Sequence, residues 1–164
     1  MRILGIDPGL QATGYGVIDL TEQFTLECRA AGVIRPAGSD LAPRLLQLHT
    51  ELTAVLHEFI PDAMAVEDLY ATYSHPRTAI LMGHARGVIF LAAAQRAVPV
   101  LSYTPTDVKR AVTGHGHAGK EQVQAMVLRM LRLPDAPIPD HVSDALALAL
   151  CHASRERGLR VTRR

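Results

Sequence analysis

Several residue types are scarce in this chain, and each scarcity narrows what it can be. Its 164 residues include no tryptophan and only two cysteines, Cys28 and Cys151. These thiols lie far apart in the sequence, which favours buried reduced cysteines over a disulfide framework. The N-terminus, MRILGIDPGL, lacks the long apolar stretch and cleavage site of a secretory signal. No apolar run approaches the roughly 20 residues that cross a bilayer. We therefore expect a cytoplasmic protein that does not enter a membrane.

Excess charge is also missing, because the formal net charge is only +1. The net charge therefore does not by itself indicate a protein that binds nucleic acid. A hydrophobic fraction of 48% is ample for one core. We expect a single domain over residues 1–157 and a basic, flexible C-terminal tail over 158–164. That tail either contacts phosphates or is simply a solvated end.

Lysine is the rarest cation, since 15 of the 17 basic residues are arginine. The two exceptions, Lys109 and Lys120, are candidates for positions that need a compact ammonium group. Codon bias alone can also deplete lysine, so the composition leaves both explanations open.

Hydrophobic periodicity and turn residues predict the order of strands and helices. Strands are expected at 2–7, 13–20, 24–35, 63–68 and 99–104. Helices are expected at 41–59 with Asp40 as the N-cap, about 78–97, 107–112 with Thr106 as the cap, 120–133, and from about Asp140 to Arg157.

This order predicts an α/β fold. A three-strand meander followed by βαβ crossovers makes a mixed five-stranded sheet with helices on both faces. The first, fourth and fifth strands are expected to be parallel. Binding sites in open sheets gather at the carboxyl edge of such strands. The helix at 78–97 is apolar around most of its circumference, which indicates burial, including burial in a subunit interface.

Two acids are placed at that edge. Asp7 follows a buried strand and precedes Pro8-Gly9, and Glu67 closes another buried strand. Taken alone, Asp-Pro-Gly is good turn chemistry, and Glu67 fits a strand-end acid paired with an arginine. Taken together, two converging carboxylates suit Mg²⁺ or Mn²⁺.

The segment PDHVSDALALAL adds further candidate ligands at the start of the last helix. Asp144 lies three residues after His141 and four after Asp140, so either pair shares a helix face. A site built from two strand ends and a helix start is a nuclease arrangement in which two metal ions assist phosphodiester cleavage.

Six motifs occur along the chain in this order: GIDPGLQATGYGVI, AVEDLY, GHARGVI, VKRAVTG, GKEQVQAMV and DALALAL. In order and spacing they resemble the RuvC Holliday-junction resolvases over nearly the whole chain. The resemblance implies a ribonuclease H-like fold, a homodimer and a divalent-metal endonuclease. That family nicks two strands of like polarity at a four-way DNA junction. A branch-migration complex of the RuvA/RuvB type is the further partner implied.

The resemblance also assigns residues. It makes Asp7, Glu67 and Asp144 metal ligands, with Mg²⁺ or Mn²⁺, two ions per site, as the cofactor. The family pattern has an acid three residues before Asp144, where this chain has His141, which is a departure. His141 is therefore either a ligand or a general base. Asp140 is expected to cap the helix, with a role as an additional or alternative ligand left open.

The remaining candidates are expected to contact DNA. The resemblance places Lys109 and Lys120 near the scissile phosphate. It places Tyr70 against an unstacked base, where the alternative is a core or interface tyrosine. Tyr73 and Arg77, from the same loop, are candidates for backbone contacts. Arg86, on the apolar helix, is expected to make a structural ion pair.

These features predict an endonuclease that resolves Holliday junctions by paired symmetric nicks in recombination and repair. Three other functions compete: an actin-like ATPase, a ribonuclease H-like nuclease acting on RNA or RNA–DNA hybrid, and a non-catalytic junction-binding module. An actin-like ATPase needs two such domains, and 164 residues hold one.

Overall fold

Strand β1 (Arg2–Asp7) lies at the centre of a five-stranded sheet. The computed structural model describes residues 1–68, 76–134, 136 and 138–162. Strand β2 (Thr13–Leu20) pairs antiparallel with β1, and β3 (Leu26–Ile34) pairs antiparallel with β2. Strands β4 (Ala63–Glu67) and β5 (Val100–Tyr103) continue the sheet in parallel on the other side of β1. The predicted meander and parallel crossovers are confirmed.

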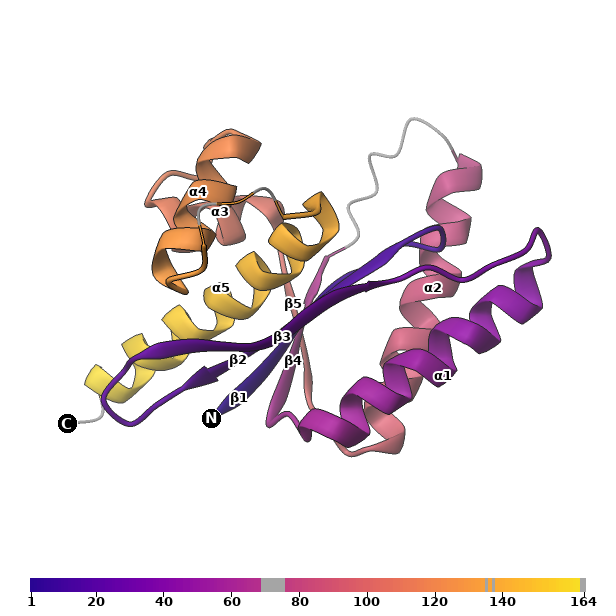
Figure 1. Ribbon diagram of the computed structural model, residues 1–164, viewed down its shortest axis with the longest axis horizontal. Coiled ribbons are helices and arrows are strands. Elements are labelled where there is room, and N and C mark those ends of the chain that lie inside the picture. The colour runs from indigo at the N-terminus through magenta and orange to yellow at the C-terminus, as the bar shows by residue number, and fades with distance from the viewer. Residues whose placement is uncertain (69–75, 135, 137, 163–164) are drawn as a thin grey trace.

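Helices cover both faces of the sheet, as predicted (Figure 1). Helices α1 (Leu41–Phe59) and α2 (Pro76–Gln95) lie on one face. Helices α3 (Pro105–Thr113), α4 (Lys120–Met130) and α5 (Asp140–Thr162) lie on the other. Side chains of β1 alternate between the two cores, with Ile3 in the α5 core and Leu4 and Ile6 in the α1/α2 core.

The predicted N-cap of α1 is confirmed, whereas the start of α3 and the end of α5 differ from the sequence prediction. Asp40 occupies the N-cap of α1 but makes no capping hydrogen bond with its side chain. Thr104, not Thr106, caps α3, because Pro105 takes the first helical position and the Thr104 hydroxyl accepts from the Asp107 N–H at 3.1 Å. Helix α5 continues to Thr162 and does not end near Arg157. The domain boundary and the flexible tail stay predictions.

Helix α2 corrects the expectation that no segment approaches the length of a membrane span. Residues Arg77–Gln95 form a helix that is long and apolar enough to cross a membrane, judged by length and composition alone, with a mean hydropathy of 1.2. This is weak evidence, because helices of soluble proteins pass the same test. Ala85, Ile89 and Ala93 of α2 are buried, but Ile80 and Leu91 are 61% and 53% exposed. The helix is therefore buried along one side only.

Candidate active site

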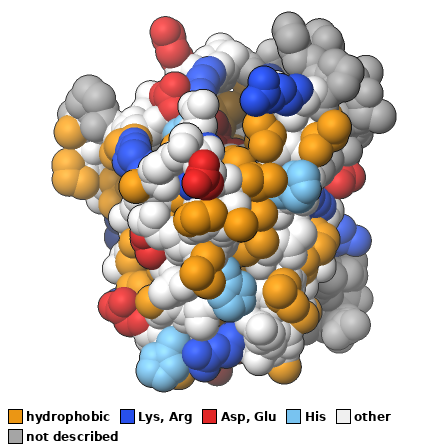
Figure 2. Space-filling view, turned by 90° about the vertical axis from the view of Figure 1, so that its right-hand side faces the viewer, with side chains coloured by type: hydrophobic (Ala, Val, Ile, Leu, Met, Phe, Trp, Pro, Cys, Tyr) orange, Lys and Arg blue, Asp and Glu red, His pale blue; other side chains and the backbone are white. Residues whose placement is uncertain are grey.

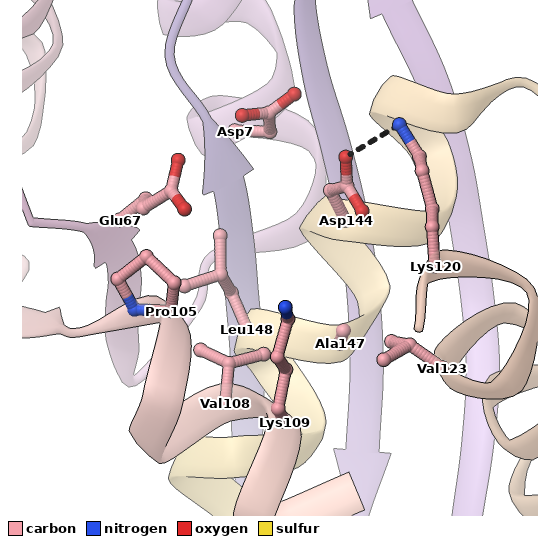
Figure 3. Close-up of a pocket in the computed structure, with 10 residues that line it drawn as sticks. All are labelled: Asp7, Glu67, Pro105, Val108, Lys109, Lys120, Val123, Asp144, Ala147 and Leu148. Atoms are coloured by element: carbon pink, nitrogen blue, oxygen red, sulfur yellow. Dashed lines mark ion pairs between the residues drawn. The ribbon is translucent and has the colours of Figure 1, made fainter. Parts of the chain in front are cut away.

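Three carboxylates and two ammonium groups line one pocket of about 220 Å³ at the carboxyl edge of the sheet (Figure 3). Asp7 and Glu67 come from the ends of the neighbouring parallel strands β1 and β4. Asp144 and Lys120 enter from α5 and α4, and Lys109 from α3. The pocket walls are completed by Pro105, Val108, Val123, Ala147 and Leu148. The structure thus brings together five of the predicted site residues.

Glycines in β1 and β2 let α5 lie close enough to contribute to this pocket. A Cβ atom at Gly5 would overlap the main-chain oxygen of Ala145, and one at Gly14 would overlap that of His141. Gly14 stands opposite Asp7 in the sheet. The absence of side chains at these two positions therefore sets the distance between the helix start and Asp7. Sequence reasoning missed this role, although TGYG at the predicted strand was a visible signal.

Burial and mutual repulsion disfavour ionisation of the acids in the pocket. Burial raises the pKa of Asp7, and the His141 hydrogen bond opposes that shift. Burial, with repulsion from Asp7 and Asp144, raises the pKa of Glu67 to about 7. Burial also raises the pKa of Asp144, although Lys120 acts in the opposite direction. The pocket therefore favours an added positive charge.

Lys120 supplies part of that positive charge, and its ammonium group lies beside two acids of α5. Its Nζ lies 3.0 Å from an Asp140 oxygen and 3.6 Å from an Asp144 oxygen. The hydrogen bond with Asp140 is the main cause that raises the pKa of Lys120.

The role of Asp140 as helix cap is wrong in this structure. The Val142 and Ser143 N–H groups donate to the Pro139 carbonyl, and Asp140 is already the first helical residue. Its carboxylate is 68% exposed and pairs with Lys120.

His141 lies against Asp7 and not on the pocket wall. Its Nδ1 is 2.6 Å from an Asp7 carboxylate oxygen, and its side chain is 45% exposed. One ring nitrogen is thus engaged with an acid of the site, while nearly half of the side chain faces solvent. This geometry is compatible with both predicted roles, ligand or general base.

Of three further predicted DNA contacts, the structure describes only Arg77. Tyr70 and Tyr73 lie outside the described residues. Arg77 is exposed in the first turn of α2 and does not line the pocket. The predicted ion pair of Arg86 is confirmed, because its Nη2 lies 3.4 Å from an Asp68 oxygen.

The donor set fits hard divalent cations. Three carboxylates with raised pKa values share one pocket, and oxygen ligands of this kind suit Mg²⁺ and Mn²⁺. Within residues 1–68, 76–134, 136 and 138–162, no three His, Cys, Asp or Glu side chains are grouped tightly enough for one ion.

Comparisons with known proteins agree with the geometry. The family model "Crossover junction endodeoxyribonuclease RuvC" matches residues 3–152. A protein of that name from Rhodopirellula baltica is 52% identical over 91% of this chain and 84% of its own length. One from Desulforamulus reducens is 46% identical over 93% of both.

A solved structure extends this agreement to the fold. Thermus thermophilus RuvC in complex with a Holliday junction substrate superposes with a TM-score of 0.90 and 38% identity, covering 96% of both chains. The fold implied by the resemblance is therefore confirmed. This chain belongs to the RuvC family of crossover junction endodeoxyribonucleases.

Proposed function

We propose that this chain is a metal-dependent endonuclease that resolves four-way DNA junctions in recombination and repair. It cuts by paired symmetric nicks in strands of like polarity. The observation that carries the proposal is the pocket in which Asp7, Glu67 and Asp144 meet Lys109 and Lys120. Family membership supports it independently, and it disfavours an actin-like ATPase and an RNA-directed nuclease.

Asp7, Glu67 and Asp144 would hold Mg²⁺ or Mn²⁺, two ions per site. When bound, such ions lower the pKa of water and stabilise the leaving oxygen of a phosphodiester. Lys109 and Lys120 hold the scissile phosphate and offset the charge that develops on it. Water attacks the phosphorus and the 3′ oxygen leaves, so the products keep ligatable ends.

His141 acts on the same reaction from the Asp7 side. As a ligand, it replaces the acid of the family pattern, and an imidazole suits Mn²⁺ at least as well as Mg²⁺. As a general base, it takes a proton from the attacking water. The substitution His141→Asp separates the roles. A ligand role predicts an altered preference between Mg²⁺ and Mn²⁺ with cleavage retained. A base role predicts an unchanged metal preference and a pH profile of cleavage that shifts to lower pH, because a carboxylate accepts a proton at lower pH than an imidazole does.

Tyr70, Tyr73 and Arg77 are proposed to contact DNA next to the site. Tyr70 follows Glu67 by three residues, which suits a ring that stacks on an unpaired base near the scissile phosphate. Tyr73 and Arg77 are then close enough in sequence to contact the backbone of the same arm.

A homodimer is proposed because the α1/α2 face is apolar. A groove of about 470 Å³ lies on it, lined by Leu45, Ile80, Gly83, His84, Gly87, Val88 and Leu91. Figure 2 looks onto this side of the molecule and shows apolar side chains spread across it. A two-fold dimer presents two sites to a two-fold junction, which accounts for paired nicks. In solution, Leu91→Asp should convert the dimer to a monomer, and an unchanged mass would contradict this assignment.

A branch-migration complex of the RuvA/RuvB type is the proposed further partner, and the cytoplasm the proposed compartment. Both rest on membership of the family.

A cleavage assay with four matched substrates tests the function. The purified protein with Mg²⁺ or Mn²⁺ should cut a four-way junction and leave linear duplex and single strands intact. Preferential cleavage of an RNA–DNA hybrid would instead indicate the RNA-directed nuclease. Tight junction binding without cleavage in either metal would indicate a non-catalytic binding module.

A further inference from the structure

One arginine connects helix α2 to the end of the strand that carries Glu67. Arg86 donates through Nη1 to the main-chain oxygen of Glu67. Its Nη2 lies 2.6 Å from the Ser102 hydroxyl on β5 and 3.4 Å from an Asp68 carboxylate oxygen. A single guanidinium thus holds the carboxyl ends of β4 and β5 from the α2 side of the sheet.

The guanidinium is itself held in place. Its carbon lies 4.6 Å from the centre of the Phe90 ring, one helical turn further along α2. The Arg86 side chain is only 11% exposed. Stacking on an aromatic ring fixes the plane of the guanidinium fork, so its donors point in set directions.

The ion pair with Asp68 is the least important of these contacts. Asp68 is 49% exposed at a distance of 3.4 Å, and exposed ion pairs contribute little to stability. A charge-assisted hydrogen bond to a main-chain oxygen is stronger and more directional. The contact that matters is therefore the one to the residue whose side chain lines the catalytic pocket.

We propose that Arg86 is a positioning residue for the cleavage reaction, which acts by fixing the main chain of Glu67 so that its carboxylate points into the pocket. The inference rests on the proposed function. A similar contact supports it at the other strand end, because Arg44 of α1 donates to the Leu10 main-chain oxygen at 2.7 Å, just after the Asp7-Pro8-Gly9 turn. The two helices of this face thus each hold the chain behind one acid of the site.

The test uses the full-length protein and three variants. Arg86→Met keeps the aliphatic stem over Phe90 and removes the donors, whereas Arg86→Lys keeps one cationic donor. Arg96→Met is the matched control, because Arg96 is exposed and follows the last residue of α2 directly. Junction cleavage is followed with saturating enzyme, junction affinity is measured without divalent metal, and Mn²⁺ binding to the DNA-free protein is measured by calorimetry.

Arg86→Met should cut about 10–100-fold more slowly than the control, which is the usual effect of removing a group that orients a metal ligand. Its affinity for Mn²⁺ should also fall. Junction affinity without metal and the oligomeric state should not change. Arg86→Lys should recover part of the rate. Equal rates for Arg86→Met and Arg96→Met would overturn the proposal. Loss of rate together with loss of junction affinity would also overturn it, because Arg86 would then be merely structural.

Ser102→Ala keeps the proposal testable if Arg86→Met does not fold. It removes one oxygen that holds the guanidinium, and should slow cleavage and weaken Mn²⁺ binding without changing junction affinity. Unchanged cleavage and Mn²⁺ binding in Ser102→Ala would then overturn the positioning role. If the wild-type protein cuts no junction at all, the proposed function fails. If it cuts and the variants cut equally well, only this inference fails.

Discussion

Gly14→Ala should uncouple catalysis from stability, because it adds one methyl group where α5 meets β2. The new Cβ would overlap the main-chain oxygen of His141, well inside the 3.0 Å that real Cβ contacts essentially never pass. The clash is with backbone, so no side-chain rotation relieves it. The start of α5, with His141 and Asp144, must move away from Asp7.

The two consequences differ in size. Overpacking of this kind costs typically about 1–3 kcal/mol of the free energy of unfolding, which a domain with about 5–15 kcal/mol survives. Misplacing reacting groups by about 1 Å can reduce a rate by about 100-fold. Gly14→Ala should therefore remain folded at 25 °C but lose most of its junction cleavage.

The assay compares urea unfolding with cleavage at saturating enzyme. Gly158→Ala is the matched control, because it lies in α5 with open space around its Cβ position. The control should gain up to about 1 kcal/mol from better helix propensity and keep its cleavage rate. A Gly14→Ala protein that cuts as fast as the control would refute the idea that close packing of α5 on the strands sets the site geometry.

Two further predictions concern charge and pH. The Arg2 and Arg29 guanidinium groups lower the pKa of Asp19 to about 2 from 3.8, so their stabilisation is complete above pH 3.8 and lost as the pH falls through about 2. Because both arginines are partly exposed, Asp19→Asn should reduce the free energy of unfolding at pH 7 by only about 1–2 kcal/mol, and chemical denaturation of the two proteins should converge towards pH 2. His152 is 2% exposed and its Nδ1 lies 2.6 Å from the Tyr103 hydroxyl. Burial lowers the pKa of His152 from 6.5. The unfolded chain therefore binds a proton that the folded protein does not, and the free energy of unfolding falls as the pH drops below 6.5. In urea unfolding, His152→Leu should lose stability at pH 8 and lose part of this pH dependence, whereas a variant with the wild-type pH slope would contradict the assignment.

The sheet and its acids were predictable because local pattern and global topology agree. Buried strands that end in Asp7 and Glu67 lie side by side and parallel, so their ends meet at one edge. The alternation within β1 and the apolar periodicity of the helices then place the cores on both faces. Lysine scarcity also singled out Lys109 and Lys120, which the structure brings to the pocket.

Contacts between distant segments were not predictable. Asp140 has the sequence position of a cap, but Lys120 from another helix takes its carboxylate. The cap of α3 is a different kind of error, because Pro105 after Thr104 is a local signal for the first helical position and it was missed. The Arg86 hydrogen bond to the Glu67 main chain spans α2 and β4, and no single segment contains a signal for it.

Cleavage by Asp7→Asn is the measurement that tests the central claim most directly. Asn keeps the size of the side chain and removes the charge at the end of β1. Asp19→Asn is the matched control, because Asp19 pairs with Arg2 at the opposite end of β1. The account predicts that Asp7→Asn binds a four-way junction as well as the control does and does not nick it in Mg²⁺ or Mn²⁺. An Asp7→Asn protein that cuts the junction at the rate of the control would contradict the assignment of this pocket as the active site.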